Sequence, residues 1–468
     1  MKTIKTISVY FSCFIAIACI TPKVQAQPQP DQFAREIHKE LVEIDTTTAT
    51  GDTLAAAEAM AVRLKSGGFA DADVQVLSPG PRKGNLVARL HGTGLRKPML
   101  LVAHIDVVPA KKEDWTTDPF KLVEKDGYVY GRGVSDDKFM AAVWVANMIR
   151  FKQEGYVPDR DIILVLETDE EILDANSQGM QWLLKNHRDL IDAEFAINEG
   201  ADVSLKNGKV ISNVVQTSEK VSYFFKLEVK NNGGHSALPT KDNAIYHLAD
   251  GLARLSRFSF PVNLNETTRG YFSKSARLES GQVAADMLAV AAPKPDLAAA
   301  KRLSNTPLYN AQFHTTCVAT LLEGGHANNA LPQVARATVN CRMLPNEKVT
   351  DVQEKINQVL NDKQINVTLI SRPTLSDPSP LNPEIITAMN KVGAEFWPNA
   401  PLIPYMAVWA TDGSFLRNAG ISTYGNSGLA SDIDDVRLHG KDERVSTKAF
   451  SDGREYLYKL VKALSSKN

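Results

Sequence analysis

The sequence predicts an α/β protein: a larger domain with a mixed sheet covered by helices on both faces, plus an inserted α+β domain. Three observations support this prediction. Short Val-, Ile- and Leu-rich strand candidates alternate with helix candidates up to about residue 215, which is typical of a sheet covered by helices. Longer alternating strands begin near Thr217, and the first pattern returns after Pro373. We therefore assign residues 27–216 and 372–468 to the larger domain and residues 217–371 to the insertion.

The first part of the larger domain is interpreted from its hydrophobic spacing. Helix candidates place apolar residues three and four positions apart, and strand candidates are short apolar runs bounded by turn residues. One helix has Asp52 or Thr53 as its cap and Gly67-Gly68 as its stop. The expected helices are Phe33–Ile44, Thr53–Gly67, Lys138–Gln153 and Ser177–Asn186, and the expected strands are Asp73–Leu77, Asn85–Leu90, Met99–Val107, Ile162–Glu167 and Phe195–Asn198.

The insertion has a different texture. Residues Val221–Val229 alternate like an antiparallel strand, and a Ser-, Pro- and Ala-rich stretch extends from Phe258 to about Leu308. The other elements expected here are helices at Ala244–Arg257 and Asp351–Asp362, a hairpin with arms His314–Leu322 and Val334–Leu344, and a strand at Asn366–Ile370. After the insertion we expect helices at Pro383–Phe396 and Ser446–Ser465.

The N-terminus predicts export. Two lysines precede an apolar run from Ile7 to Ile20, and Val24-Gln25-Ala26 is a small-x-small site. This pattern indicates a cleavable signal peptide, residues 1–26, because the run is too short to span a bilayer and no second long apolar stretch follows. A short uncleaved anchor and a lipoprotein beginning at Cys19 are the alternatives. The mature protein is expected to be periplasmic or secreted, without a membrane span.

Composition and cysteine content narrow the class of protein further. The chain has 468 residues, of which 43% are hydrophobic, and a formal net charge of −1. This near-neutral balance gives no reason to expect nucleic acid as a partner. Signal removal would leave Cys317 and Cys341, which face each other if the hairpin is centred near Asn329. A disulfide is allowed in an exported chain, and two buried free thiols fit equally well.

Acidic and histidine side chains collect where predicted strands end or tight loops begin. Carboxyl ends of parallel strands meet at one edge of an α/β sheet, so we expect these side chains to lie together. Two imidazoles and three carboxylates suit a pair of divalent metals about 3.5–4 Å apart, which is a hydrolytic arrangement. His and carboxylate ligands accept zinc, cobalt or manganese. The candidate ligands are His104, Asp136, Glu171, Glu199 and His439.

Each of these residues also has a simpler interpretation. His104 alone fits a hydrogen-bonded strand end, and Asp136 alone fits a helix N-cap. The metal interpretation is favoured because adjacent carboxylates such as Asp136-Asp137 repel unless a cation or backbone donors neutralise them. In that interpretation Glu170 stays free of metal and can move a proton from water to a leaving amine. Asp106 shares a strand face with His104 and can fix the tautomer of the imidazole.

The candidate residues lie in or near a series of short motifs, which in chain order are AHIDVVP, WTTDPF, YGRGVSDDK, TDEE, NEG, GGHSALP, NNALP with CRMLP, and LHGKDE. In this order the motifs resemble those of the two-zinc exopeptidases and amidohydrolases that include aminoacylase, carboxypeptidase G, vacuolar carboxypeptidase S and succinyl-diaminopimelate desuccinylase. The resemblance covers nearly the whole mature chain, and the length of the insertion is most similar to the carboxypeptidase S branch. Phe139, in place of the family's usual glycine, and the ILDANSQG stretch after Glu171 depart from the pattern.

The resemblance implies a role for each candidate residue. Asp136 would bridge the metals, with His104 and Glu199 completing one shell and Glu171 and His439 the other. Glu170 would be the general base, Asp106 would orient His104, and the Asp136–Asp137 peptide would be cis. The insertion would be a lid and dimerisation domain. His235 would then reach the active site of a partner subunit, and the carboxylate-recognition positions match Asn329 and Arg342.

The implied function is that of an exported zinc-dependent carboxypeptidase or dipeptidase, which hydrolyses the amide next to a free C-terminal amino acid in short peptides. The first alternative is an aminoacylase-like N-acyl-amino-acid amidohydrolase, because the recognition of the carboxylate would be shared. A periplasmic protein that only binds metal or peptide is a remote alternative, since Glu170 and every ligand are present. No GxSxG motif supports a serine hydrolase, and neither mature cysteine has an imidazole or carboxylate beside it in the sequence.

Overall fold

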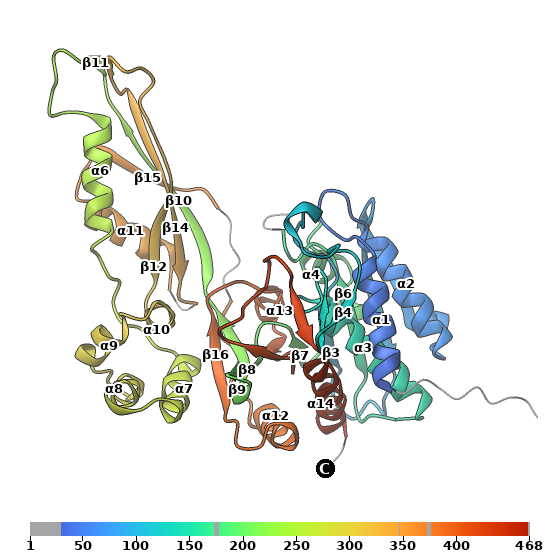
Figure 1. Ribbon diagram of the computed structural model, residues 1–468. Coiled ribbons are helices and arrows are strands. Elements are labelled where there is room, and N and C mark those ends of the chain that lie inside the picture. Colours follow the sequence, from blue (N-terminus) through green and yellow to red (C-terminus); the bar gives the residue numbers. More distant parts are fainter. Residues whose placement is uncertain (1–29, 173–176, 346, 372–375, 467–468) are drawn as a thin grey trace, which may run out of the picture.

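The computed structural model describes residues 30–172, 177–345, 347–371 and 376–466 (Figure 1). The expected signal peptide therefore lies outside the described residues. Within them, the larger domain contains a ten-stranded mixed sheet with the order β1-β2-β6-β3-β7-β17-β9-β8-β18, and β16 pairs with β9. Its strands are β1 (Val74–Gly80), β2 (Lys83–Leu90), β3 (Met99–His104), β6 (Ile162–Glu167), β7 (Phe195–Asn198), β8 (Val203–Lys206), β9 (Lys209–Glu219), β16 (Leu402–Ala407), β17 (Ser422–Gly425) and β18 (Ala430–Asp432).

Helices cover both faces of this sheet, as the sequence predicts. Alternate residues of β3 point to opposite sides: Leu101 and Ala103 join one buried core, and Leu100 and Val102 join the other. None of the helices in the described ranges is long and apolar enough to cross a bilayer. The first face carries α1 (Pro30–Glu43), α2 (Thr53–Ser66), α3 (Lys138–Gln153), α12 (Pro383–Phe396) and α14 (Thr447–Ser465), and the second carries α4 (Gly179–Asn186), α5 (Arg188–Ile191) and α13 (Gly413–Asn418).

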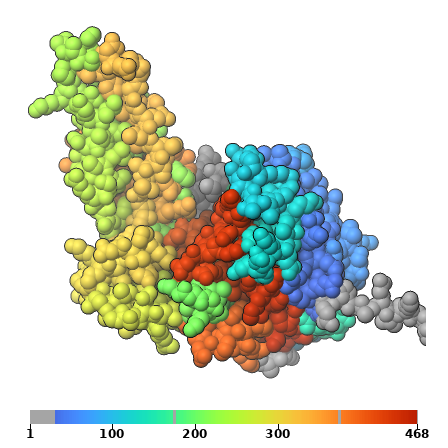
Figure 2. Space-filling view, viewed as in Figure 1, coloured from blue at the N-terminus to red at the C-terminus, as the bar shows by residue number. Residues whose placement is uncertain are grey.

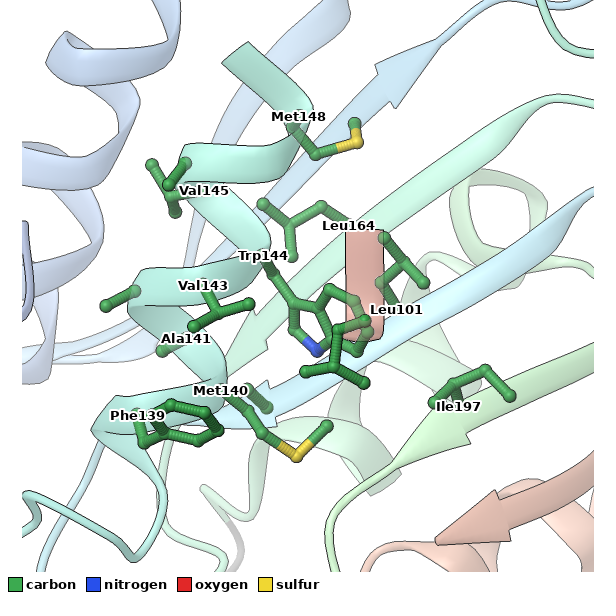
Figure 3. Close-up of a cluster of buried hydrophobic side chains, with 14 of the residues drawn as sticks. Leu101, Phe139, Met140, Ala141, Val143, Trp144, Val145, Met148, Leu164 and Ile197 are labelled. Carbon is green, nitrogen blue, oxygen red and sulfur yellow. The ribbon is translucent and has the colours of Figure 1, made fainter. Parts of the chain in front are cut away.

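Helix α3 is the centre of the larger core. Figure 3 shows Trp144 pointing from α3 toward Leu101 and Leu164 of the sheet. Its indole nitrogen donates to the Val102 carbonyl at 3.1 Å, so the polar atom of this fully buried side chain is satisfied. Phe139, at the departure from the family pattern, is also fully buried and packs edge-to-face on Phe450 of α14. The phenyl group therefore fills volume in the larger core, between α3 and α14.

The insertion forms a second sheet, the lid sheet, with the order β12-β14-β10-β15 in the described part of the chain. Helices α6 and α11 pack on one face, and Figure 1 shows this face turned away from the larger domain. At the far tip, β11 pairs with β13. The elements are β10 (Val221–Lys230), β11 (Gly234–His235), β12 (Thr316–Gly324), β13 (Ala330–Leu331), β14 (Val334–Met343), β15 (Ile365–Leu369), α6 (Ala244–Leu255) and α11 (Val349–Leu360).

The sequence left the state of the two mature cysteines open, and the structure joins them. Cys317 on β12 and Cys341 on β14 are directly opposite in register and form a disulfide. Cys341 is fully buried. The bond therefore ties the edge strand of the lid sheet to its neighbour.

The Ser-, Pro- and Ala-rich stretch forms a helical block with a core of its own, built around Phe272, Met287 and Phe313. The block packs on β16 of the larger domain: Lys274 Nζ donates to the Leu402 carbonyl at 2.9 Å, and the Tyr271 ring lies 5.9 Å from the ring of Tyr405. Part of the insertion is thus fastened to the larger domain. The helices are α7 (Glu266–Ser275), α8 (Gly281–Ala291), α9 (Leu297–Leu303) and α10 (Pro307–Phe313).

Candidate metal centre

The candidate ligands meet at one edge of the large sheet. Strands β6, β3 and β7 are neighbours and run parallel, so their carboxyl ends, at Glu167, His104 and Asn198, lie side by side. His104 is the last residue of β3, and Glu199 directly follows β7. The predicted convergence of these segments is therefore what the fold produces.

His104 is held from behind by Asp106. Its Nδ1 donates to the Asp106 carbonyl oxygen at 3.0 Å, while the Asp106 carboxylate lies 3.6 Å away. That carboxylate instead accepts the backbone N–H groups of Glu170 and Glu171, each at 3.1 Å. Asp106 therefore orients the imidazole mainly through its backbone, and its side chain fixes the turn that carries both glutamates.

Asp136 lies between the two predicted histidines. Its Oδ1 is 3.0 Å from Nε2 of His104, and its Oδ2 is 3.0 Å from Nε2 of His439. The same His439 nitrogen is 2.9 Å from Glu171 Oε1. Ligand atoms of His104, Asp136 and Glu171 all lie within 4.8 Å of one another. The Asp136–Asp137 peptide is cis, as the resemblance implies.

The donor set fits a divalent cation. Because Nδ1 of His104 donates to a carbonyl, the neutral imidazole presents a lone pair at Nε2, which faces a carboxylate oxygen. Two acceptors approach this closely only with a proton or a metal cation between them. Hydrogen bonds to Asp136 and Glu171 raise the pKa of His439 to about 10, which shows how strongly the surrounding acids favour a positive charge here.

Excess negative charge surrounds this point. Burial, together with the neighbouring carboxylates, raises the pKa of Glu170 and of Glu199 well above the usual range. For Glu199 the repelling charges are those of Asp136, Asp137 and Asp412. Glu199 therefore lies close enough to Asp136 to be repelled by its charge, and bound cations would relieve this repulsion. Within the described residues Glu170 forms a hydrogen bond through its backbone N–H only, so its carboxylate has no partner there.

Glu443 and Arg132 support the site and were not singled out from the sequence. The buried Glu443 carboxylate accepts the Gly133 N–H at 3.1 Å and the Ser135 N–H at 2.9 Å, and it pairs with Arg132 at 2.8 Å. Arg132 also donates to the carbonyl of His439 at 3.2 Å. The loop before Asp136 and the loop of His439 are thereby fastened together. The available signal was the acid of LHGKDE, four residues after the histidine.

The candidate site residues of the lid lie in two separate places. His235 is paired with Ala330 at the tip, where Ser236 donates to the Asn329 carbonyl, so His235 and Asn329 lie together. Arg342 is near the base, opposite Ser222. Arg342 lies eight residue steps after Val334 along β14, about 27 Å at the rise of a β-strand. One protomer therefore does not bring Asn329 and Arg342 together, and Figure 1 shows the tip far from the metal centre.

Comparison with known proteins identifies the family. The family model described as Peptidase family M20/M25/M40 matches residues 100–463. The chain belongs to this family. It is a metal-dependent hydrolase of peptide or linear amide bonds, as the motifs predict.

Relatives within the family differ in what they are named for. N-fatty-acyl-amino acid synthase/hydrolase PM20D1 from Homo sapiens is 28% identical over 380 residues, covering 78% of this chain and 74% of that protein. The Dictyostelium discoideum protein named Probable carboxypeptidase S-like 2 is 27% identical over 378 residues, covering 78% of this chain and 71% of that protein.

Solved structures share the fold. The M20 family metallo-carboxypeptidase Sso-CP2 from Sulfolobus solfataricus aligns with a TM-score of 0.65 at 18% identity, over 92% of this chain and 98% of the other. A dinuclear metal binding peptidase of the M20 family from Bacillus subtilis gives 0.60 at 12% identity, over 93% and 98%. This agreement supports the predicted fold class, a catalytic α/β domain that carries a lid.

Proposed function

We propose that the protein is an exported carboxypeptidase or dipeptidase that uses two zinc ions to hydrolyse the amide next to a free C-terminal amino acid. The observation that carries this proposal is Asp136, whose two oxygens each face one imidazole at 3.0 Å. In the proposed site His104 and Glu199 complete one metal shell, and Glu171 and His439 complete the other. Cobalt or manganese would fit the same donor atoms.

The residues around this centre divide the chemistry between them. Bound metals would polarise the substrate carbonyl and lower the pKa of a water toward ~7. Glu170 takes the proton of the attacking water and returns it to the leaving amine, a role suited to its raised pKa. Asp106 keeps Glu170 in place through the backbone N–H of that residue. Arg342 provides a guanidinium for the substrate carboxylate.

A second copy of the chain would complete the site. Edge strand β12 leaves Val318, Leu321 and Leu322 each more than 60% exposed, and an open apolar strand edge favours pairing with another chain. Such a homodimer could bring the tip residues His235 and Asn329 to the metal centre of the partner. His235 would then stabilise the developing oxyanion, and Asn329 would join the Arg342 of the other protomer at the substrate carboxylate.

N-acyl amino acids are the second candidate substrate class. The observation that favours them is the human relative named for N-fatty-acyl amino acids. A carboxylate held at Arg342 would be common to both substrates, so the group on the acyl side decides between them. Export through the predicted signal peptide would place either activity in the periplasm or outside the cell.

The test is metal analysis combined with a substrate panel on the mature chain, residues 27–468. The panel contains Gly-X dipeptides, acetyl amino acids and long-chain acyl amino acids. Glu170→Gln is expected to lose about a hundredfold to ten-thousandfold in kcat while retaining its metal, because only the proton transfer is removed. A Glu170→Gln enzyme with near-normal turnover would reject the role of Glu170. A fully metallated wild type that is inert on the whole panel would reject the proposed function.

A further inference from the structure

Trp409 presents an exposed aromatic face close to the junction of the two domains. It lies two residues after β16, and its side chain is 46% exposed. Its ring packs 5.8 Å from the ring of Tyr405, which is only 8% exposed. Tyr405 in turn packs on Tyr271 of α7. Tyr405 thus supports the indole on one side, while nearly half of the Trp409 side chain stays exposed.

The loop of Trp409 is linked through hydrogen bonds and packing to the strand end beside Glu199. Two residues further on, Thr411 donates to Glu219 at 2.7 Å and accepts a hydrogen bond from Gln216 at 3.3 Å. Gln216 packs directly against Gly200: a Cβ added there would lie 2.3 Å from Gln216 Oε1. Gly200 is the neighbour of the proposed ligand Glu199. The position of Trp409 is therefore coupled to the strand end that carries this ligand.

The same loop is tied to the base of the lid. Lys220, between β9 and β10, donates its backbone N–H to the Ala407 carbonyl at 2.8 Å. Its Nζ is 3.3 Å from Thr316 Oγ1, and Thr316 is directly opposite Arg342 in the lid sheet. Arg342 belongs to the sheet face that α6 and α11 do not cover, since the alternate residues Cys341 and Met343 are in their core. Trp409 and Arg342 therefore flank one junction, from the catalytic domain and from the lid.

Figure 2 shows the surface hollowed between the lid and the larger domain. A substrate with its carboxylate at Arg342 and its amide at Asp136 has the leaving amino acid on the junction side of the scissile bond. We propose that Trp409 is a specificity-determining residue that packs against the side chain of this leaving amino acid and favours large apolar or aromatic ones. The inference rests on the proposed function, and it assigns Trp409 no contact with the acyl side of the substrate.

The experiment measures kcat/KM of the metal-loaded mature protein with acetyl-Phe, acetyl-Ala and octanoyl-Ala, and with Gly-Phe and Gly-Ala. Trp409→Ala is expected to lower the Phe-to-Ala ratio about tenfold, the scale on which an apolar pocket discriminates side chains. Trp409→Phe should keep the ratio within about twofold, because an aromatic face remains. The octanoyl-to-acetyl ratio should not change in either variant. Leu288→Ala on α8, where Leu288 is 55% exposed, is the matched control and should leave every ratio unchanged.

Each result decides between the two proposals. An unchanged Phe-to-Ala ratio in Trp409→Ala, or a shift in the octanoyl-to-acetyl ratio instead, overturns the role of Trp409 and leaves the proposed function standing. A wild type that cleaves none of the substrates ends both. If Trp409→Ala does not fold, Trp409→Gln takes its place with the same expected loss, and circular dichroism confirms that the variants compared are folded.

Discussion

Removal of the Glu443 carboxylate is the sharpest test of how the metal centre is built. Glu443 is 1% exposed and lies 311 residues from Arg132 in the sequence. Its oxygens accept three backbone N–H groups, of Gly133, Ser135 and Asp136, and the Ser135 hydroxyl at 2.8 Å. Glu443→Ala would leave these donors and the guanidinium of Arg132, which is 3% exposed, without their acceptor.

The expected cost follows from these contacts. Breaking a buried ion pair by removing one partner costs about 3–5 kcal/mol. Each buried donor left unpaired costs about 1–3 kcal/mol when taken alone, but such losses are not additive within one network. We therefore expect a loss of about 3–5 kcal/mol in the free energy of unfolding. At about 2–3 °C per kcal/mol for a domain of this size, the melting temperature should fall by roughly 6–15 °C. Glu443→Gln should fall between Glu443→Ala and the wild type.

Metal content should fall as well, because Asp136 and His439 are carried by the two loops that Glu443 joins. The assay combines calorimetric melting with metal analysis at equal protein concentration. Glu228→Ala is the control: Glu228 also pairs with an arginine, Arg336, but on the accessible surface of the lid, where such a pair contributes about 0–1 kcal/mol. If Glu443→Ala melts like the wild type and retains its metal, the supporting role of this network is refuted.

Two further predictions concern the lid and the protons of the site. Replacing both cysteines of the Cys317–Cys341 disulfide by serine should destabilise the lid by about 3–4 kcal/mol, the loop-closure entropy expected for a loop of this length. Denaturant unfolding with and without reductant measures this loss. If reductant changes the unfolding of the wild type no more than that of the variant, the prediction is contradicted. Metal binding should release protons at pH 7, because the pKa of His439, raised to about 10 by Asp136 and Glu171, keeps its imidazole protonated below that pH and a ligand must be deprotonated. Metal affinity should therefore weaken as pH falls. Titration calorimetry in buffers of different ionisation enthalpy measures the proton release, and equal heats of metal binding in all buffers would refute the prediction.

For some helices and strands, local sequence signals predict the first and last residue correctly. Helix α12 begins and ends as predicted, at Pro383 and Phe396, because its start combines Pro at the first turn with the Asn382 side chain accepting the Glu384 N–H. Helix α3 and strand β6 also have their predicted bounds, since each is a dense apolar run between turn residues. Such elements are defined by contacts between residues close in sequence, which a single sequence displays.

Other features depend on contacts that the sequence does not display. The helices of the helical block were not predicted, because the stretch was interpreted only as rich in Ser, Pro and Ala. The capping box of Asn265 and Thr268 nevertheless marks the start of α7. His38 of α1 is a buried histidine, although histidine is more often found at least partly exposed. It is 1% exposed, and burial lowers its pKa to about 3. Its spacing from Ala34 and Leu41 places it on the apolar face of α1, so the helical period of the sequence indicates its burial better than the residue type does.

The metal centre also contains residues that the sequence predicts and, within a few ångströms of them, residues that it does not. The structure brings His104, Asp136, Glu171 and His439 together, and each was visible beforehand because ligand chemistry restricts the residue type. The residues that hold them carry no such restriction: a buried carboxylate that caps a loop, such as Glu443, looks like any acid in a turn until its donors are placed around it. Support of this kind should therefore be sought at the partners of the ligand loops. Its loss should first appear as lower metal content and a lower melting temperature, before any change in the chemistry of the bound metals.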